Sequence, residues 1–387
     1  MTDIDSKPAG AGERAGADAQ ARAGEQARAR ERSGAGERSS VGKRRLLGID
    51  WGTSNRRAYL VDGGGACLAS RADDQGLLAA RPDFGASLAA LLAAMDIAPG
   101  VPVVASGMVG SAQGWRQTPY LDIGVPLLEL PAHLTRVDEA DENDDLGGRS
   151  VLLVPGYSQH ERGADGHVRI DVMRGEEMQL LGALMLRTHG RDGTAGAAGS
   201  DSEGGGGGDG GNGDGWYVLP GTHSKWVRLE GGAIRHIATF MTGELFATLG
   251  KQGTLAPLME GAAGEESPES DAAFDAGVDE ARRRAPLSNA LFGVRARVVT
   301  GAMPAAHTRA FVSGLLIGAE LVAALDLAGH DPGAVTSVCT PALHRHYARA
   351  AGRLGVTLQA LDPDRVYQAA LGFFLHHIDP VHQRSQP

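Results

Sequence analysis

Cysteine is scarce in this chain: Cys67 and Cys339 are the only two in 387 residues. Two cysteines cannot build a disulfide framework, and they lack the ligand spacing of a structural zinc site. This usage is typical of a reducing compartment, so we expect a cytoplasmic protein.

Long apolar runs and a basic surplus are also missing. No run approaches the roughly 18 apolar residues of a membrane span, and the N-terminus lacks the apolar stretch of a secretory signal. Acidic residues outnumber basic ones by 47 to 37, for a formal net charge of −10. Nucleic-acid binding needs clustered Lys and Arg, so we expect neither a membrane nor a nucleic-acid partner.

The composition that is present, 42% hydrophobic and 22% charged, is typical of globular proteins, and the length suffices for two domains. Two segments contain too few large apolar residues to form a core: an Ala-, Gly-, Arg- and Glu-rich start, and a Gly-rich tract. We therefore expect a disordered tail (1–44), a first lobe (45–187), a flexible insertion (188–215), a second lobe (216–380) and a short tail (381–387).

A short motif occurs twice, at 52–60 and at 221–229. Each copy begins with Gly-Thr after an apolar strand pattern and continues into a second strand pattern. A strand, a Gly-Thr turn and a returning strand predict a hairpin whose corner offers backbone N–H groups and a hydroxyl to phosphate oxygens. The duplication predicts two similar lobes facing each other across a nucleotide-binding cleft.

The two copies differ in charge. Asp50 stands two residues before the first glycine, whereas Leu219 holds that position in the second copy. Magnesium is usually held by one or two carboxylates together with water and substrate phosphates, so Asp50 is a candidate metal ligand. The alternative is that Asp50 only caps a turn.

The remaining pattern indicates an α/β protein of mixed sheets. In the first lobe we expect strands at 46–49, 57–61, 66–70, 101–105 and 151–154, with helices at 84–95 and 174–187. In the second lobe we expect strands at 216–219, 226–229, 233–238 and 335–339, with helices at 311–327 and 365–376.

Three polar segments could carry chemistry. The glycine-rich loop 106–116 follows a predicted strand, and such strand ends open toward ligands in α/β sheets; it is otherwise a plain connection. The cluster 171–177 supplies either helix-capping acids or a general base beside an anion-binding Arg174. In 239–246 we expect Thr242 to be a helix N-cap, with a substrate contact as the alternative.

These segments together resemble the 2-dehydro-3-deoxygalactonokinase family. The resemblance spans about residues 45–376 and is carried by the motifs GIDWGTSN (48–55), SGMVGS (106–111), QGWR (113–116), DVMRGEE (171–177), LPGTHSKW (219–226) and FMTGELF (240–246). It implies the two-lobed actin-like ATPase fold, with a mixed five-stranded sheet and helices in each lobe. It also implies ATP-dependent phosphorylation of the 6-hydroxyl of 2-dehydro-3-deoxy-D-galactonate in galactonate breakdown.

The resemblance implies a role for each candidate residue. Asp50 would coordinate Mg²⁺ through water, and positioning with charge neutralisation would supply most of the catalysis. The first phosphate corner would consist of Gly52, Thr53, Ser54 and Asn55, and the second of Gly221, Thr222 and His223, with Lys225 adding positive charge.

For the general base we choose Glu176, with Asp171 second and Arg174 beside them. The substrate loop would use Ser106, Met108, Gly110, Trp115 and Arg116, with Trp115 as a stacking face and Arg116 or Arg174 meeting the substrate carboxylate. The adenine side would involve 339–343, which is poorer in glycine than expected for this fold. His344 and His346 are read as helix-surface residues rather than metal ligands.

Two other functions remain open from the sequence. One is a kinase for a related sugar or sugar acid, and the other is a non-catalytic sugar sensor of the same fold. Kinases of this fold are often homodimers, so a dimer is implied as well.

Overall fold

The computed structural model describes residues 44–137, 146, 149, 151–163, 166, 168–189, 213–260, 267–329 and 332–378. The predicted disordered tail (apart from Arg44), most of the predicted insertion and the C-terminal tail lie outside the described residues. The described residues make up the two lobes.

Two sheets repeat one strand order. The first runs β3-β2-β1-β4-β7-β6 and the second β12-β11-β10-β13-β14. In each sheet, three antiparallel strands are followed by parallel strands. The first sheet comprises β1 (Arg45–Trp51), β2 (Arg56–Asp62), β3 (Cys67–Asp73), β4 (Val103–Gly107), β6 (Thr135–Arg136) and β7 (Val151–Leu153). The second comprises β10 (Gly215–Leu219), β11 (Ser224–Glu230), β12 (Ala233–Phe240), β13 (Val335–Val338) and β14 (Leu358–Leu361).

The repeated order confirms the duplication that the sequence predicts. The expected five strands are found in the second sheet, whereas the first gains the two-residue strand β6, which pairs antiparallel with β7. The expected strands all form, with ends that differ by up to three residues.

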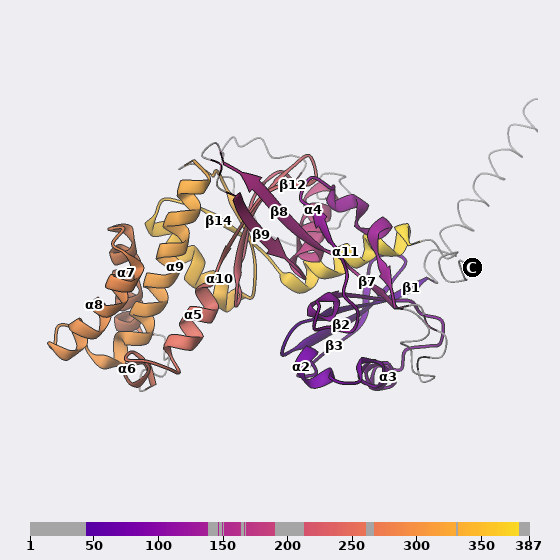
Figure 1. The fold of residues 1–387 in the computed structure, drawn as a ribbon, viewed down its shortest axis with the longest axis horizontal. Helices are drawn as coiled ribbons and strands as arrows, with labels where there is room; N and C mark the ends of the chain where they lie inside the picture. The colour runs from indigo at the N-terminus through magenta and orange to yellow at the C-terminus, as the bar shows by residue number, and fades with distance from the viewer. Residues whose placement is uncertain are drawn as a thin grey trace, which may run out of the picture.

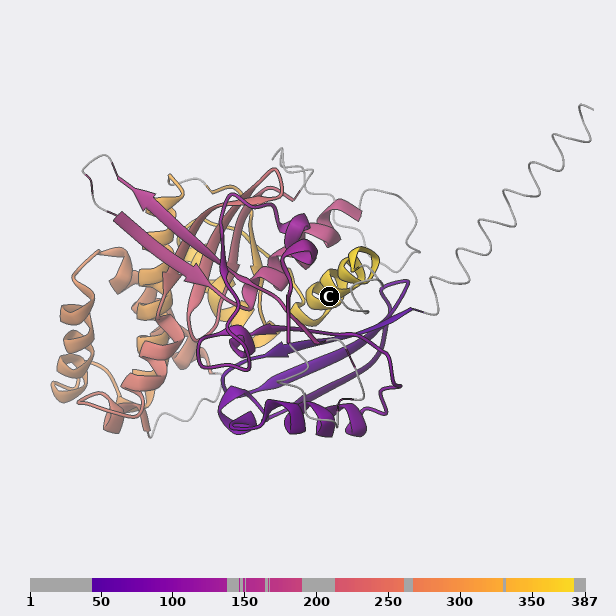
Figure 2. The same cartoon turned by 45° about the vertical axis from the view of Figure 1, so that its right-hand side comes forward.

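A third sheet was not foreseen. It consists of β5 (Tyr120–Asp122), β8 (Gly156–Arg162) and β9 (Val168–Met173). Figure 2 shows the β8–β9 hairpin extending past the second sheet. The backbone N–H of Thr239 in β12 donates to the carboxylate of Asp171 in β9 at 2.8 Å, which joins the hairpin to the second lobe.

Two helices lie between the sheets: α4 (Glu176–His189), which follows β9, and α11 (Pro363–His377), which ends the described chain (Figure 1). They pack closely because Gly182 of α4 has no side chain: a Cβ there would lie 1.8 Å from the carbonyl oxygen of Val366. On the other side of α11, a Cβ on Gly48 of β1 would lie 2.2 Å from Leu371.

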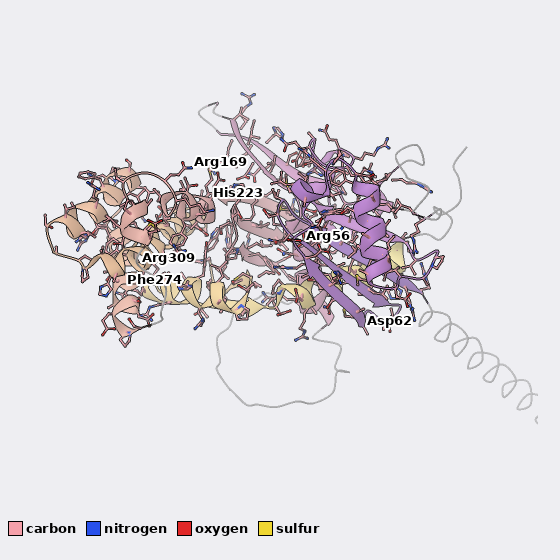
Figure 3. All side chains as sticks on the ribbon, turned by 90° about the horizontal axis from the view of Figure 1, so that it is seen from below. Arg56, Asp62, Arg169, His223, Phe274 and Arg309 are labelled. Carbon is pink, nitrogen blue, oxygen red and sulfur yellow. The ribbon has the colours of Figure 1, made fainter. Side chains whose placement is uncertain are left out.

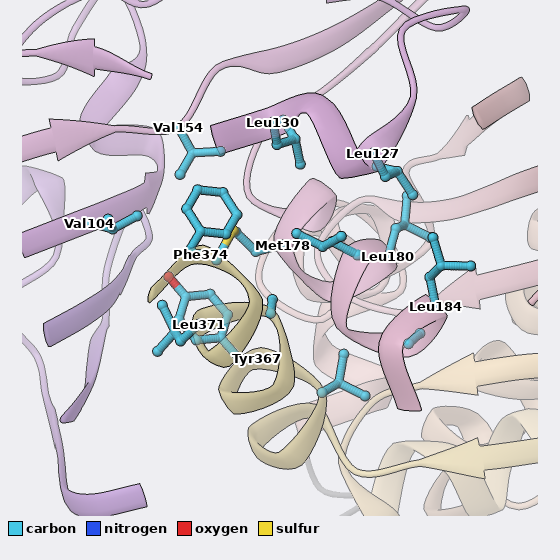
Figure 4. Close-up of a cluster of buried hydrophobic side chains, with 14 of the residues drawn as sticks. Val104, Leu127, Leu130, Val154, Met178, Leu180, Leu184, Tyr367, Leu371 and Phe374 are labelled. Carbon is cyan, nitrogen blue, oxygen red and sulfur yellow. The ribbon is translucent and has the colours of Figure 1, made fainter. Parts of the chain in front are cut away.

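The core around these helices belongs to both lobes. One cluster of buried apolar side chains contains Leu46 and Val104 of the first sheet, Tyr217 and Val227 of the second, and both helices. Figure 4 shows its centre, where Leu371 and Phe374 of α11 face α4 and the first sheet. Burial of apolar surface therefore couples the two lobes directly.

The other helices cover the outer faces. In the first lobe, α2 (Leu77–Ala80) and α3 (Phe84–Ala94) pack on the far side of the first sheet. The second lobe carries a group of helices at one end of the molecule (Figure 1): α5 (Thr242–Leu249), α6 (Ala256–Glu260), α7 (Pro268–Arg282), α8 (Leu287–Val299), α9 (Thr308–Leu327) and α10 (Pro341–Arg353). The helix N-cap expected at Thr242 is wrong by one residue, since Met241 is the N-cap and Thr242 is the first helical residue.

One segment, Ala305–Leu327, is long and apolar enough to cross a membrane by length and composition, which the sequence analysis did not anticipate. More than half of its most apolar window is buried, and α9 carries Glu320 near its middle. We assign it to the core of the second lobe, where it packs against α7.

Candidate functional site

The first Gly-Thr turn links β1 to β2 and is exposed at Thr53, Ser54 and Asn55. It is closed by a hydrogen bond from the backbone N–H of Gly52 to the carbonyl oxygen of Asn55 at 3.0 Å. The next residue, Arg56, is buried and forms an ion pair with Asp73 at 2.9 Å, which anchors the start of β2. The turn therefore presents polar groups on a rigid base.

Asp50 lies near the end of β1, with Arg57 of β2 as its cross-strand partner. Burial raises the pKa of Asp50, the Arg57 charge opposes this, and Asp364 raises it further. No described residue donates a hydrogen bond to the Asp50 carboxylate among the bonds that the structure defines. The carboxylate is thus partly desolvated and available to a cation.

The second Gly-Thr turn links β10 to β11 and is exposed at Gly221, Thr222 and His223. The start of α5 braces it, because the backbone N–H of Glu244 donates to the Thr222 carbonyl at 2.9 Å. The Glu244 carboxylate also lies 2.6 Å from Nε2 of His223. Gly243 allows this approach, since a Cβ there would lie 2.3 Å from the Gly221 carbonyl oxygen.

Lys225, expected to add charge to this turn, points elsewhere. Its side chain is only 6% exposed, and its ammonium donates to the carbonyl of Val172 at 2.7 Å and to the hydroxyl of Thr239 at 2.8 Å. The structure therefore places Lys225 between β9 and β12, close enough to lower the pKa of Glu176.

Asp171 is part of the same junction. One of its oxygens accepts from the Thr239 hydroxyl at 2.5 Å and from the Val172 N–H at 2.8 Å, and the other accepts from the Thr239 N–H. Both oxygens are therefore occupied in joining β9 to β12.

Glu176 and Glu177 begin α4. Oε2 of Glu176 accepts from the backbone N–H of Arg174 at 3.1 Å, and Oε2 of Glu177 accepts from that of Gly175 at 2.7 Å. Burial raises the pKa of Glu176, and the charge of Asp50 raises it further against the opposing effect of Lys225. Burial and the neighbouring Glu176 raise the pKa of Glu177 to about 8.

Two glycines bring the first lobe against the start of α4. Gly107, at the end of β4, has φ +91°, and Gly175 has φ +111°, both in the region that favours glycine. A Cβ on Gly175 would lie 3.4 Å from Cα of Gly107, and one on Gly107 would lie 3.5 Å from Oδ1 of Asp50. Asp50 and the acids of α4 thus share one region.

Arg174 is held by residues that the sequence did not indicate. Its guanidinium lies 4.3 Å from the ring centre of Tyr120, donates to the Thr118 carbonyl at 3.1 Å, and hydrogen bonds to the Thr118 hydroxyl. Its Nε is buried and has no hydrogen-bond partner in the part of the chain that the structure describes. That unused donor is available to an anion.

The loop 106–116 differs in part from its predicted use. Ser106 is fully buried and its hydroxyl pairs with that of Tyr367 at 2.8 Å, so it supports α11. Trp115 is half-buried and packs against the core of the first lobe, parallel to Phe84 with ring centres 6.1 Å apart and edge-on to Trp51. Its use as a stacking face for the substrate stays a prediction.

The other predicted members of that loop are Met108, Gly110 and Arg116. Met108–Gly110 forms a turn of 3-10 helix. Met108 and Arg116 are half-buried, and Gly110 is buried against Arg174 and Thr118. The loop thus places Gly110 beside Arg174, the arginine that we predicted from the sequence to bind an anion.

A cavity of about 430 Å³ opens beside the second turn. Its lining includes Gly221 of the turn, Gly243 and Phe246 of α5, Phe274 of α7, Arg309 of α9 and Leu343 of α10. The Arg309 guanidinium lies 4.8 Å from the ring centre of Phe246. In Figure 3, Phe274 and Arg309 lie in the helical end of the molecule, and His223 lies between them and Arg56 of the first sheet.

Most of this cavity is not marked by the sequence. Residues 339–343 were expected on the adenine side, and Leu343 does line the cavity. Phe246, Phe274 and Arg309 come from three helices that are distant in sequence, and no local pattern marks them as neighbours. His344 and His346 lie on α10, as the sequence predicted.

Comparisons with known proteins agree with these features. A family model described as 2-keto-3-deoxy-galactonokinase matches residues 50–203 and 204–373, which is most of the chain. This chain belongs to the 2-keto-3-deoxy-galactonokinase family. The resemblance seen in the sequence motifs is therefore confirmed.

Two relatives of this galactonokinase family member are similar over nearly their whole length. A protein named probable 2-dehydro-3-deoxygalactonokinase DgoK1, from Rhizobium meliloti (strain 1021), is 33% identical over 86% of this chain and 97% of its own. The 2-dehydro-3-deoxygalactonokinase of Escherichia coli (strain K12) is 32% identical over 86% of this chain and 98% of its own.

A solved structure supports the fold of this galactonokinase family member. The crystal structure of a Sinorhizobium meliloti protein assigned as a 2-dehydro-3-deoxygalactonokinase superposes with a TM-score of 0.69 at 31% identity, over 87% of this chain and 97% of the other. With the repeated sheet order, this confirms the predicted actin-like ATPase fold.

Proposed function

We propose that this protein transfers the γ-phosphoryl group of ATP to the 6-hydroxyl of 2-dehydro-3-deoxy-D-galactonate, in galactonate breakdown. The proposal rests on family membership and on the names of two relatives that match over nearly their full length. The observation that carries it is the second Gly-Thr turn, which forms part of the wall of a cavity large enough for a nucleoside.

The nucleoside of ATP binds in the cavity of about 430 Å³, and its phosphates extend past Gly221 toward the first turn. Apolar and aromatic walls, here Phe246, Phe274 and Leu343, suit a purine ring, and a few polar groups suffice to orient it. Backbone N–H groups of the exposed turns 52–55 and 221–223 then bind the phosphate oxygens.

The residues present fit a magnesium ion. Asp50 offers a carboxylate that accepts no hydrogen bond from the described residues, and these residues contain no group of three or more acidic, His or Cys side chains that could enclose a metal. One carboxylate completed by water and phosphate oxygens is the usual Mg²⁺ arrangement in such sites. When bound, the ion would neutralise charge on the phosphates.

Glu176 is the general base in this proposal. Its carboxylate accepts the proton of the substrate hydroxyl as that oxygen attacks the γ-phosphorus, and the bond from phosphorus to the β–γ bridging oxygen breaks to release ADP. The half-buried Glu176 carboxylate has a raised pKa and is therefore a stronger base than an exposed one. Asp171 is disfavoured because hydrogen bonds from Thr239 and Val172 occupy both of its oxygens.

Arg174 is the ligand for the substrate carboxylate. It carries a buried, unpartnered Nε and is oriented by Thr118 and Tyr120. Arginine binds carboxylates through paired N–H donors, which also fixes the orientation of the substrate. Because the two cysteines are free thiols and the relatives are sugar-acid kinases by name, we place this reaction in the cytoplasm.

A substrate panel tests this function. Purified protein with MgATP should phosphorylate 2-dehydro-3-deoxy-D-galactonate with higher kcat/KM than related aldonates, other keto-deoxy acids and neutral sugars. Preference for a neutral sugar would refute the proposed substrate. Binding of ATP without turnover of any panel member would instead favour a sensor of the same fold.

A further inference from the structure

Glu320 is a buried carboxylate that the proposed mechanism does not use. It lies near the middle of α9 and is 2% exposed. None of the ion pairs formed among the described residues includes it. Burying an unpaired carboxylate costs free energy unless hydrogen bonds compensate, so the environment of Glu320 needs an explanation.

Four donors surround this carboxylate, two for each oxygen. Oε1 accepts from the hydroxyl of Ser224 at 2.6 Å and from the indole N–H of Trp226 at 2.9 Å. Oε2 accepts from the hydroxyls of Thr242 at 2.5 Å and Tyr347 at 2.8 Å. Burial raises the pKa of Glu320, and the four hydrogen bonds oppose this rise because they favour the ionised acceptor.

The donors come from the elements that build the nucleotide side of the proposed site. Ser224 directly follows the turn 221–223 and begins β11. Thr242 begins α5, whose next residues support that turn, and it also lines the cavity. Tyr347 of α10 lines the same cavity. A single side chain therefore links the turn, the start of α5 and the wall formed by α10.

An apolar side chain could not replace these bonds. Without an acceptor at this point, three hydroxyls and an indole N–H would lose their partner inside the lobe, and each unsatisfied group is costly. The hydroxyl groups of Ser224 and Thr242 donate to Glu320 on the inner side of the turn. The backbone N–H groups of the turn remain free for a ligand on its outer side.

We propose that Glu320 is a positioning residue that sets the geometry of the second Gly-Thr turn and of the nucleoside cavity without touching the nucleotide. This inference rests on the proposed ATP site. It deepens that proposal by assigning nucleotide affinity to a carboxylate behind the turn.

The test is Glu320→Gln, which keeps the side-chain length but replaces one acceptor oxygen with an NH₂ group, so two of the four donors must turn to accept or lose their partner. We expect KM for ATP, and the Kd of the non-hydrolysable analogue AMPPNP measured by calorimetry, to rise about tenfold or more. KM for the sugar acid should stay within about twofold, because the substrate side of the proposed site lies in the first lobe. Glu280→Gln is the matched control: Glu280 lies on α7 outside the cavity, is paired with Arg283 and Arg297, and should leave both constants unchanged.

Ser224→Ala serves if Glu320→Gln does not fold, since it removes one donor and should raise the Kd of AMPPNP by a smaller factor. A folded Glu320→Gln variant with unchanged AMPPNP affinity would overturn the inference, as would equal losses for both substrates. AMPPNP binding is measured without sugar acid, so a wrong substrate assignment would leave this test intact. Failure of the wild-type protein to bind AMPPNP would overturn both proposals.

Discussion

Adjacent acids at the start of α4 occupy different environments. Glu176 is half-buried near Lys225 and Asp50, whereas Glu177 is fully buried, with one oxygen lacking any hydrogen-bond partner. The same residue type can therefore serve two purposes at neighbouring positions. Glu176 can accept a proton at the site, and Glu177 holds one in the core, since its pKa of about 8 keeps it protonated at neutral pH.

The choice between Glu176 and Asp171 can be tested by isosteric substitution. Glu176→Gln should lower kcat by about 10²–10⁴ with little change in KM for the sugar acid, because a general base acts in the transition state. Asp171→Asn should cost about 1–3 kcal/mol of stability through lost bonds to Thr239, with a smaller loss in kcat. Steady-state kinetics and thermal unfolding separate the two effects.

The pH profile provides a second readout for Glu176. Turnover should fall as the base becomes protonated, and the raised pKa of Glu176 should place this loss at a higher pH than for an ordinary carboxylate. The acidic limb should disappear from the kcat profile of Glu176→Gln. A limb that survives in this variant would move the base to another residue.

Glu177 should make the protein less stable as the pH rises. Between about pH 4.5 and 8 the folded protein keeps a proton on Glu177 that the unfolded chain releases, so raising the pH through this window favours unfolding. Glu177→Gln mimics the protonated form. Its free energy of unfolding relative to wild type should not change below pH 4.5 and should increase by about 3–5 kcal/mol by pH 8.5. Chemical denaturation measures the difference in free energy of unfolding between Glu177→Gln and wild type. A difference that does not depend on pH would contradict a buried, protonated Glu177.

At the scale of elements, the contact between α4 and α11 depends on missing side chains. Gly182 lets the backbone of α4 approach that of α11, and Gly48 lets β1 approach Leu371. Glycine in a helix interior costs roughly 1 kcal/mol relative to alanine. Gly182 has this cost, but it is needed because a larger side chain would keep α4 from packing against α11 between the two sheets.

Two Gly→Ala substitutions test this contact. Gly182→Ala should destabilise the protein by about 1–3 kcal/mol, because its Cβ would lie 1.8 Å from a backbone carbonyl oxygen that cannot turn away. Gly293→Ala in α8 has no atom within 4 Å of its new Cβ and should stabilise by up to about 1 kcal/mol. Urea unfolding measures the change in the free energy of unfolding for both variants. Equal changes would show that helix propensity alone determines the effect.

Across the whole molecule, the two lobes share a core, so we expect them to unfold together. Trp51 and Trp115 report on the first lobe, whereas Trp216 and Trp226 report on the second. Fluorescence of variants that keep one pair, with Phe at the other two positions, should give the same unfolding midpoint for both lobes. Two separate midpoints would show that the shared cluster does not couple them.

A nucleotide should stabilise both reporters equally. At about 100 times its Kd, MgAMPPNP should add about 2.7 kcal/mol to the free energy of unfolding of the whole protein. Asp50→Asn should reduce this gain in the free energy of unfolding when magnesium is present. When a chelator removes the magnesium, the gain from the nucleotide should be nearly the same in the variant and the wild type. If the gain in the wild type does not depend on magnesium, the proposal that Asp50 holds the metal is contradicted.

Local patterns in the chain predicted its elements well. Apolar runs beside Gly-Thr turns located β1, β2, β10 and β11, and helical spacing located α3, α4, α9 and α11. These features depend on neighbours along the chain. The β5-β8-β9 sheet was missed because its strands are short or partly exposed, and one of them pairs with a distant segment.

The repeated Gly-Thr motif, the lone Asp50 and the family motifs were enough to predict two lobes, a nucleotide site and a kinase, because they are short-range signals. Tertiary structure alone decided how individual side chains are used. It buried Ser106 and Lys225, packed the half-buried Trp115 against Phe84, and gathered Phe246, Phe274 and Arg309 around one cavity. The reason is physical: burial and hydrogen bonding depend on which distant segments meet, and four such segments meet at Glu320.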